Sequence, residues 1–184
     1  MCVLKRLIDF NLIVSCGRGR EDNACSELWY FLKEMGDEKA DIQETGLSGL
    51  IVAKTSMDPH EVVSKIRDLA SSKPWEVRYI LKIVPIDVVV DTSIEAICEA
   101  IDRLKDRISE EETFRVTVNK RASRVNRMAI IKAVAERIER KVDLTNYDKL
   151  VLIEVIGEKT GVSILKPEEV VSIVKIKRER GYQA

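Results

Sequence analysis

Hydrophobic and polar positions in the first half of the chain recur with two different periods. Alternating or continuous apolar runs predict strands, and apolar residues spaced by three and four predict helices. The predicted strands are residues 10–16, 41–45, 50–54 and 77–84, and the predicted helices are residues 22–35 and 58–69. The order β-α-β-β-α-β predicts a ferredoxin-like arrangement, in which two helices cover one face of an antiparallel sheet.

The second of these helices has a well-marked start. Asp58 is a favourable N-cap, Pro59 suits the first helical position, and Glu61 comes three residues after the cap. We therefore expect the helix to begin at Pro59.

The second half of the chain begins after Pro85. Its predicted elements are an extended run at 86–90, an acidic helix at 93–108, a strand at 114–118, a basic helix that reaches Lys141, strands at 150–156 and 162–165, and an edge strand at 170–176. The strand at 150–156 is apolar at nearly every position, which is typical of a strand covered on both faces. If it pairs in parallel with the strand at 114–118, the basic helix is the crossover between them. We predict an α+β protein with domains at 1–84 and 85–184.

The segment 114–141 is the most basic part of the chain. It holds nine lysines and arginines against two glutamates, a net charge of +7 in a chain whose total is zero. Ser123 is the predicted N-cap of its helix, and the predicted apolar stripe of that helix is Met128, Ile131, Val134, Ala135 and Ile138.

The polar turn predicted at 119–124 sets arginines around the start of this helix. Helix N-termini prefer negative side chains, yet Arg121, Arg124 and Arg127 stand at this one. Helix N–H groups and guanidinium groups together would suit a phosphate. The alternative is a solvated charged turn beside an ordinary core helix.

The neutral total conceals an uneven distribution of charge. Residues 87–112 hold nine acids against three bases, a net charge of −6, and they directly precede the basic segment. Separated acidic and basic faces allow a neutral protein to bind a polyanion.

Cysteine and histidine usage argues against the common catalytic and metal sites. The cysteines Cys2, Cys16, Cys25 and Cys98 form no C-x-x-C pair, and His60 is the single histidine. A zinc site or a catalytic triad is therefore not expected, and we predict no cofactor. No apolar run is long enough to span a membrane, and residues 1–10 make a poor signal peptide, so we expect a cytoplasmic protein.

Two further features remain open. Residues 17–20, Gly-Arg-Gly-Arg, come after a predicted strand but lack the remaining residues of a nucleotide-binding loop. A basic loop that meets a phosphate and a flexible tight turn are equally acceptable interpretations. Trp29, Tyr30 and Phe31 share one helix, where we expect core and rim positions rather than a base-stacking platform.

The second half resembles a THUMP domain. The resemblance is carried by FRVTVNKR, the basic helix and KVDLTNYDKLVLIEVIGEKTGVSIL, within residues 114–165. NLIVSCGRGREDNACSELWYFL and TGLSGLIVAKTSMDPHEVV in the first half look like the stand-alone THUMP proteins that assist tRNA cytidine acetylation in archaea and eukaryotes. The resemblance implies a complete THUMP domain at 85–184, preceded by the ferredoxin-like domain.

The resemblance implies a non-catalytic adaptor that binds the acceptor stem and 3′ end of tRNA and presents it to a separate tRNA acetyltransferase. The positions that match the family's RNA-binding elements are Arg18, Arg20, Arg115, Lys120, Arg121, Arg124, Arg127 and Lys159. We expect the change of Arg121 and Arg124 to Glu to abolish tRNA binding with little effect on the melting temperature. The alternatives are a small-molecule regulatory module, the RNA-binding subunit of another tRNA modification enzyme, or an enzyme with an unrecognised site.

Overall fold

The structure, a computed structural model, describes residues 9–182, so Cys2 and the predicted absence of a signal peptide at residues 1–10 lie largely outside the described residues. The chain forms two compact units. Unit 1 holds the residues up to Pro85 and those from Glu169 onward, and unit 2 is Ile86–Glu168. The sequence prediction places its single boundary after residue 84. The C-terminal residues, however, fall in unit 1, whereas the sequence prediction assigns them to the second domain.

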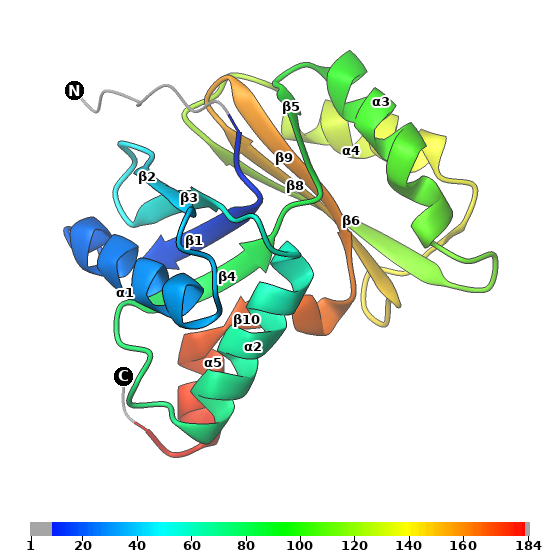
Figure 1. The fold of residues 1–184 in the computed structure, drawn as a ribbon. Coiled ribbons are helices and arrows are strands. Elements are labelled where there is room, and N and C mark those ends of the chain that lie inside the picture. The colour runs from blue at the N-terminus through cyan, green and yellow to red at the C-terminus, as the bar shows by residue number, and fades with distance from the viewer. Residues whose placement is uncertain (1–8, 183–184) are drawn as a thin grey trace. The chain divides into compact units, whose positions relative to one another are not determined.

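Unit 1 is an antiparallel sheet covered by helices, with the strand order β10-β4-β1-β3-β2 (Figure 1). Its strands are β1 (Leu12–Cys16), β2 (Asp41–Glu44), β3 (Leu50–Lys54), β4 (Ile80–Pro85) and β10 (Val171–Ser172), and its helices are α1 (Glu21–Glu34), α2 (Pro59–Ser72) and α5 (Ile173–Glu179). Alternate residues of the central strands, such as Leu12 and Val14, pack with the helices in one buried apolar cluster. The element order predicted for residues 10–84 is present.

Two helices of this unit test predictions made from the sequence, one of which is confirmed and one corrected. Asp58 caps α2, because its carboxylate accepts a hydrogen bond from the His60 N–H at 2.8 Å. The edge strand predicted at 170–176 is wrong beyond Ser172. Ser172 instead caps a helix, and Ile173 and Ile176, three residues apart, pack on the core of unit 1.

Unit 2 is a mixed sheet with the order β5-β9-β8-β6-β7, and α3 and α4 cover one face (Figure 1). Its strands are β5 (Val88–Asp91), β6 (Thr113–Arg121), β7 (Lys141–Val142), β8 (Lys149–Ile156) and β9 (Lys159–Leu165), and its helices are α3 (Ile94–Leu104), the short 3-10 helix η1 (Lys105–Arg107) and α4 (Arg127–Arg137). A second 3-10 helix, η2 (Pro167–Glu169), comes after β9.

The parallel pairing of β6 with β8 is confirmed, from Phe114 opposite Lys149 to Arg121 opposite Ile156. The crossover between these strands contains α4. Strand β8 is buried from Leu150 to Ile156, as its continuous apolar sequence predicts. Because β8 offers backbone partners this far, residues 119–121 continue the ladder of β6, and the predicted turn at 119–124 begins only after Arg121.

Helix α4 differs from its sequence prediction at its start and in its buried face. Its N-cap is Asn126, not Ser123: the Asn126 side chain accepts hydrogen bonds from the N–H groups of Met128 and Ala129. The buried residues of the helix are Ile130 and Val134, and Ile138, which directly follows it, is buried as well. Met128, predicted to be buried, is 56% exposed.

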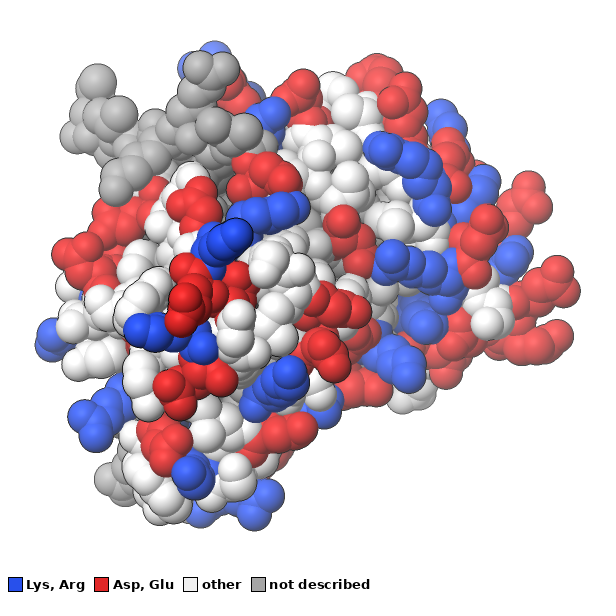
Figure 2. Space-filling view, viewed as in Figure 1, with Lys and Arg blue, Asp and Glu red and all other residues white. Residues whose placement is uncertain are grey.

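Taken together, the described residues form a mixed α/β protein with two sheets and five α-helices. None of the helices within residues 9–182 has the length and apolar character needed to cross a membrane. The visible surface carries interspersed acidic and basic side chains (Figure 2).

Candidate nucleic-acid interface

Five of the eight predicted RNA-binding residues lie at or just beyond one end of the unit 2 sheet, where β6 and β8 end and β9 begins. Arg121 pairs with Ile156 of β8, and Ile156 pairs with Lys159 of β9, so the two cations flank the same residue. The crossover starts here as well, because α4 comes after the carboxyl end of β6. We call this group the basic edge, and its members are Lys120, Arg121, Arg124, Arg127 and Lys159.

Within the basic edge, Arg121 already has an internal partner. Its Nη1 lies 2.7 Å from Oε2 of Glu154, whose side chain is only 2% exposed. The other carboxylate oxygen accepts a hydrogen bond from Asn119 Nδ2 at 2.6 Å. A buried carboxylate needs such partners, because an unpaired buried charge is costly. Arg121 is therefore a structural residue first, which corrects the expectation that Arg121→Glu leaves the melting temperature unchanged.

Lys120 and Lys159 are held more loosely. Lys120 Nζ donates to the Val125 carbonyl at 3.1 Å, which ties the loop before α4 to the strand. Lys159 Nζ lies 2.7 Å from Asp91 Oδ1, and the Asp91 side chain is 81% exposed. Exposed ion pairs of this kind contribute little to stability. Both ammonium groups can therefore exchange a partner for a phosphate at low cost.

Arg124 and Arg127 are the cations of the basic edge with the greatest freedom to bind a ligand. Both are exposed, and neither guanidinium has a hydrogen bond or ion pair within residues 9–182. Asn126 lies between them and caps two N–H groups of α4. The first turn of α4 contains no acidic residue, so its positive end is not neutralised by the chain itself.

Arg115 is predicted to belong with this group, but it lies at the opposite end of β6. It stands six positions before Arg121, roughly 20 Å along an extended strand. Its Nη1 donates to the Leu144 carbonyl at 3.1 Å, and its guanidinium stands 5.7 Å from the centre of the Tyr147 ring. Arg115 thus supports the loop before β8 and does not extend the basic edge.

Arg18 and Arg20 belong to unit 1, in the loop between β1 and α1, and both are exposed. Glu21 organises this loop: its Oε1 accepts hydrogen bonds from the N–H of Gly49 at 2.5 Å and of Gly19 at 3.2 Å. These bonds, chiefly the one from Gly49, hold the pKa of Glu21 below its ordinary value. Residues 17–20 form a tight turn, in which the Arg20 N–H donates to the Gly17 carbonyl at 3.0 Å, and the bonds to Glu21 hold this turn in place.

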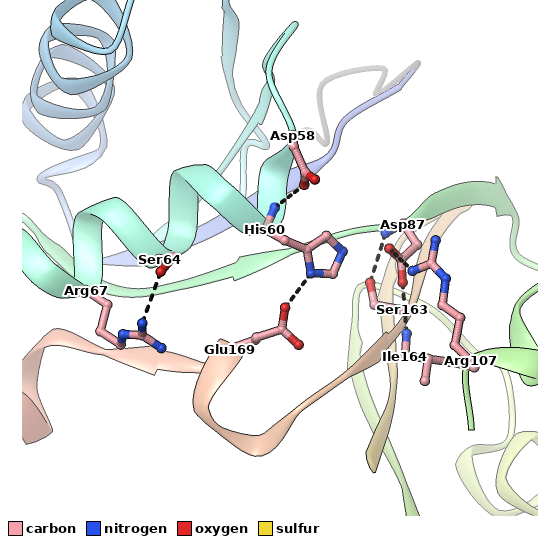
Figure 3. A network of polar contacts seen from close by, with 9 residues as sticks. All are labelled: Asp58, His60, Ser64, Arg67, Asp87, Arg107, Ser163, Ile164 and Glu169. Atoms are coloured by element: carbon pink, nitrogen blue, oxygen red, sulfur yellow. Dashed lines mark hydrogen bonds and ion pairs between the residues drawn. The ribbon is translucent and has the colours of Figure 1, made fainter. Parts of the chain in front are cut away.

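The described histidine and cysteine side chains, which could serve catalysis or bind a metal ion, have internal contacts or are buried. His60 Nδ1 lies 2.6 Å from Glu169 Oε1, within unit 1 (Figure 3). Burial, with Glu21 and Glu44 nearby, raises the pKa of Cys16 to about 11, so its thiol is protonated at neutral pH. Residues 9–182 contain no group of three His, Cys, Asp or Glu side chains that could hold a metal ion.

Unit 2 contains a second polar network that the sequence patterns did not reveal. Asp87 accepts hydrogen bonds from Arg107 Nη1 at 2.6 Å and from the Ile164 N–H at 2.9 Å (Figure 3). The Asp87 N–H donates to Ser163 Oγ at 3.1 Å. These bonds join the start of β5 to β9 and to η1, so they stabilise the sheet that carries the basic edge.

Two residues that shape the basic edge were also missed, although each has a sequence signal. Glu154 is the only acid in the apolar run of β8, LVLIEVI, and such an isolated acid requires a partner. Asn126 directly precedes the helix and belongs to the preferred N-cap residues.

Comparison with protein families identifies one domain, and several proteins are similar to the chain. Residues 91–165, within unit 2, match the model of the THUMP domain. The mouse protein named THUMP domain-containing protein 1 is 26% identical over 182 residues, which is 88% of this chain and 51% of that protein. An uncharacterized protein of Methanocaldococcus jannaschii is 28% identical over 153 residues, which is 80% of this chain and 39% of that protein. The chain thus spans about half the length of these relatives or less.

A solved structure shows the same fold over most of the chain. PH1313 from Pyrococcus horikoshii superposes with a TM-score of 0.66 at 22% identity, covering 86% of this chain and 55% of that one. The match of residues 91–165 to the family model shows that the chain contains a THUMP domain, and this domain carries the basic edge.

Proposed function

We propose that this chain, which contains a THUMP domain, is a non-catalytic adaptor that binds tRNA and presents it to a separate modification enzyme. The THUMP domain favours RNA binding, and the homologues include THUMP domain-containing proteins. One observation carries the proposal: Arg124 and Arg127 are exposed and have no internal partner in the described part of the chain, at a helix start without an acid.

The chemistry of the basic edge suits the phosphate backbone. Guanidinium groups form paired, charge-assisted hydrogen bonds with phosphate oxygens. Asn126 already accepts two N–H groups of α4, so the arginine side chains, more than the helix backbone, would make the contacts. Such contacts position an RNA without reading its bases, and recognition then comes from RNA shape and single-stranded ends.

The finer points of the proposal come from the family resemblance. We assign the acceptor stem and 3′ end as the bound part of the tRNA, and a tRNA acetyltransferase that modifies cytidine as the partner. We also interpret unit 1 as ferredoxin-like, which the order β4-β1-β3-β2 of its antiparallel strands supports. Arg18 and Arg20 would then add contacts from this unit.

The decisive experiment is binding of the full chain to unmodified tRNA across a salt series. Lysine and arginine contacts to phosphates release counterions, so affinity must fall steeply as salt rises. The double change Arg124→Glu and Arg127→Glu should weaken binding at low salt about 100-fold and reduce the salt slope by about two.

Arg103→Glu is the matched control, because Arg103 is exposed in the last turn of α3 and lies outside the basic edge. Its affinity should stay within about twofold of the unchanged chain. Absence of tRNA binding at low salt would refute the proposal, and equal losses in both variants would refute the assignment to the basic edge.

The adaptor role has its own test. The purified chain with an acetyl donor and unmodified tRNA should produce no acetylcytidine. Added to a tRNA cytidine acetyltransferase, it should raise the rate at limiting tRNA, and the Arg124→Glu and Arg127→Glu variant should not. Turnover by the chain alone would show an enzyme instead.

A further inference from the structure

The C-terminal helix of unit 1 ends in a way that positions an aromatic side chain. Gly181 has a φ of +75°, and the Tyr182 N–H donates to the Lys177 carbonyl at 2.9 Å. This left-handed glycine with its backward hydrogen bond is the Schellman cap of α5. The cap turns Tyr182 back to Trp75, and the two ring centres lie 6.1 Å apart with an angle of 39° between the planes.

Both rings remain open to solvent in spite of this contact. Trp75 is 53% exposed and Tyr182 is 44% exposed. Large aromatic side chains that are held in place and left half uncovered are typical of binding surfaces. A ligand ring can stack on the free face of either residue.

The loop that contains Trp75 is anchored to helix α1 by hydrogen bonds. The carboxylate of Glu27, on α1, accepts three backbone hydrogen bonds, from the N–H groups of Arg78 at 2.6 Å, Tyr79 at 2.9 Å and Ile80 at 2.8 Å. Arg78 Nε in turn donates to the Trp75 carbonyl at 3.3 Å. Because these bonds anchor the loop between α2 and β4, ligand binding carries a smaller entropic cost of ordering it.

The helix that leads to Tyr182 is basic. Residues 173–182 contain four bases and one acid, a net charge of +3. The side chains of Lys177, Arg178 and Arg180 have no partner within the described residues. Cations in the last turn stabilise a helix, which accounts for their sign. This stabilisation of the helix does not explain why Trp75 and Tyr182 are both exposed.

We infer that this surface binds single-stranded RNA, with bases stacked on Trp75 or Tyr182 and phosphates held by the surrounding cations. We call it the aromatic–basic patch: Trp75, Arg78, Lys177, Arg178, Arg180 and Tyr182. Aromatic rings beside a track of cations are the combination that binds single strands without reading their sequence. The inference rests on the proposed function, since the ligand is RNA, but it assigns a contact in unit 1 that does not depend on the basic edge.

The two tryptophans of the chain allow a direct test with an internal control. Trp29→Phe leaves Trp75 as the only tryptophan, and Trp75→Phe leaves Trp29. Trp29 lies on α1, is 45% exposed, and has Lys33 Nζ 5.0 Å from the centre of its ring. Titration of each full-length variant with an oligouridine of ~10 nucleotides should quench the emission of Trp75 and leave that of Trp29 unchanged.

Affinity measurements complete the test. Trp75→Ala together with Tyr182→Ala should weaken oligouridine binding about tenfold or more, since each base stack is worth that much. Trp29→Ala should leave it unchanged. Arg178→Glu should weaken it and lower its salt slope by about one. All of these side chains are exposed, so melting curves should coincide.

The outcomes separate this inference from the proposed function. Unchanged Trp75 emission at saturating oligouridine and tRNA would overturn the aromatic–basic patch, and the adaptor proposal would stand if the Arg124→Glu and Arg127→Glu variant still lost tRNA binding. Absence of any RNA binding would overturn both. If the Trp75 and Tyr182 changes abolish binding to a protein partner and leave RNA binding intact, the patch is a protein-docking surface and the RNA assignment is wrong.

Discussion

Two places in the molecule share a local plan: a strand, a short basic loop and a helix. In unit 1, β1 leads through residues 17–20 into α1, and in unit 2, β6 leads through residues 122–126 into α4. The helices that the two loops enter differ in the charge of their first turns. The first turn of α1 contains two acids, Glu21 and Asp22, whereas the first turn of α4 contains none.

This difference decides how each helix start is neutralised. The Glu21 carboxylate accepts hydrogen bonds from the N–H groups of Gly19 and Gly49. Its negative charge also lies at the positive end of the α1 dipole, so this helix start is neutralised by a residue of the chain itself. At α4 the neutral side chain of Asn126 satisfies two N–H groups, and the charges of Arg124 and Arg127 remain uncompensated among the described residues. Of the two basic loops, the one in unit 2 is therefore the better place for an external phosphate.

The largest effect we expect comes from a cation of the basic edge that does have a partner. Arg121→Glu would put a second carboxylate against buried Glu154 and should lower the free energy of unfolding by about 3 kcal/mol. Urea unfolding measures this, with Arg124→Glu as the control that should change it by less than about 0.5 kcal/mol. Adding Glu154→Gln to Arg121→Gln should recover part of the loss in the Arg121→Gln variant, because the buried charge is removed.

Equal unfolding midpoints for Arg121→Glu and Arg124→Glu would contradict the distinction between paired and unpaired arginines. They would also restore the simpler expectation that both serve RNA alone.

The next effect concerns the anion inside unit 1. Glu21→Gln should lower the melting temperature at neutral pH, by less than Arg121→Glu, because the amide replaces a carboxylate that accepts two N–H groups. The folded state keeps the pKa of Glu21 below its ordinary value of about 4.3, so its contribution is present above that pH and is lost as the pH falls through the lowered pKa.

The measurement is the melting temperature of both chains between neutral pH and the acid range. Their difference should shrink as the pH falls below about 4. Other carboxyl groups titrate in the same range, and the comparison of the two chains cancels their effect. A difference that stays constant with pH would show that the charge of Glu21 does not stabilise its loop.

The smallest expected effect comes from a substitution that stabilises the fold while it weakens tRNA binding. Arg127→Glu gives α4 the acid in its first turn that α1 already has, and should stabilise the fold by about 0.3–1 kcal/mol through the helix dipole. The same change should weaken tRNA binding about tenfold, since it removes a phosphate contact. Thermal unfolding and tRNA titration on one sample test both signs. A loss of stability would show that Arg127 supports the fold.

Local patterns were sufficient for much of the fold. The cap at Asp58, the bounds of β3 and the burial of β8 can be derived from hydrophobic period and capping chemistry. In each of these the determining residues are neighbours in the sequence.

The candidate site was predictable only in its composition. The pattern of the chain and its family resemblance select eight cations, but the partners that sort them lie far away in sequence, as Glu154 does for Arg121 and Leu144 for Arg115. The number of residues along β6 then separates Arg115 from the basic edge. No local period reveals which guanidinium will meet a buried carboxylate.

Residue patterns alone were enough to locate the positive charge and most of the strands and helices, including the basic helix. The folded chain was needed to show that Arg121 is tied to Glu154 while Arg124 and Arg127 have no such partner within residues 9–182, and that the C-terminal residues return to unit 1. Periodicity and capping act over a few neighbouring residues, whereas the pairing of buried charges and the covering of apolar faces depend on residues that only folding brings together.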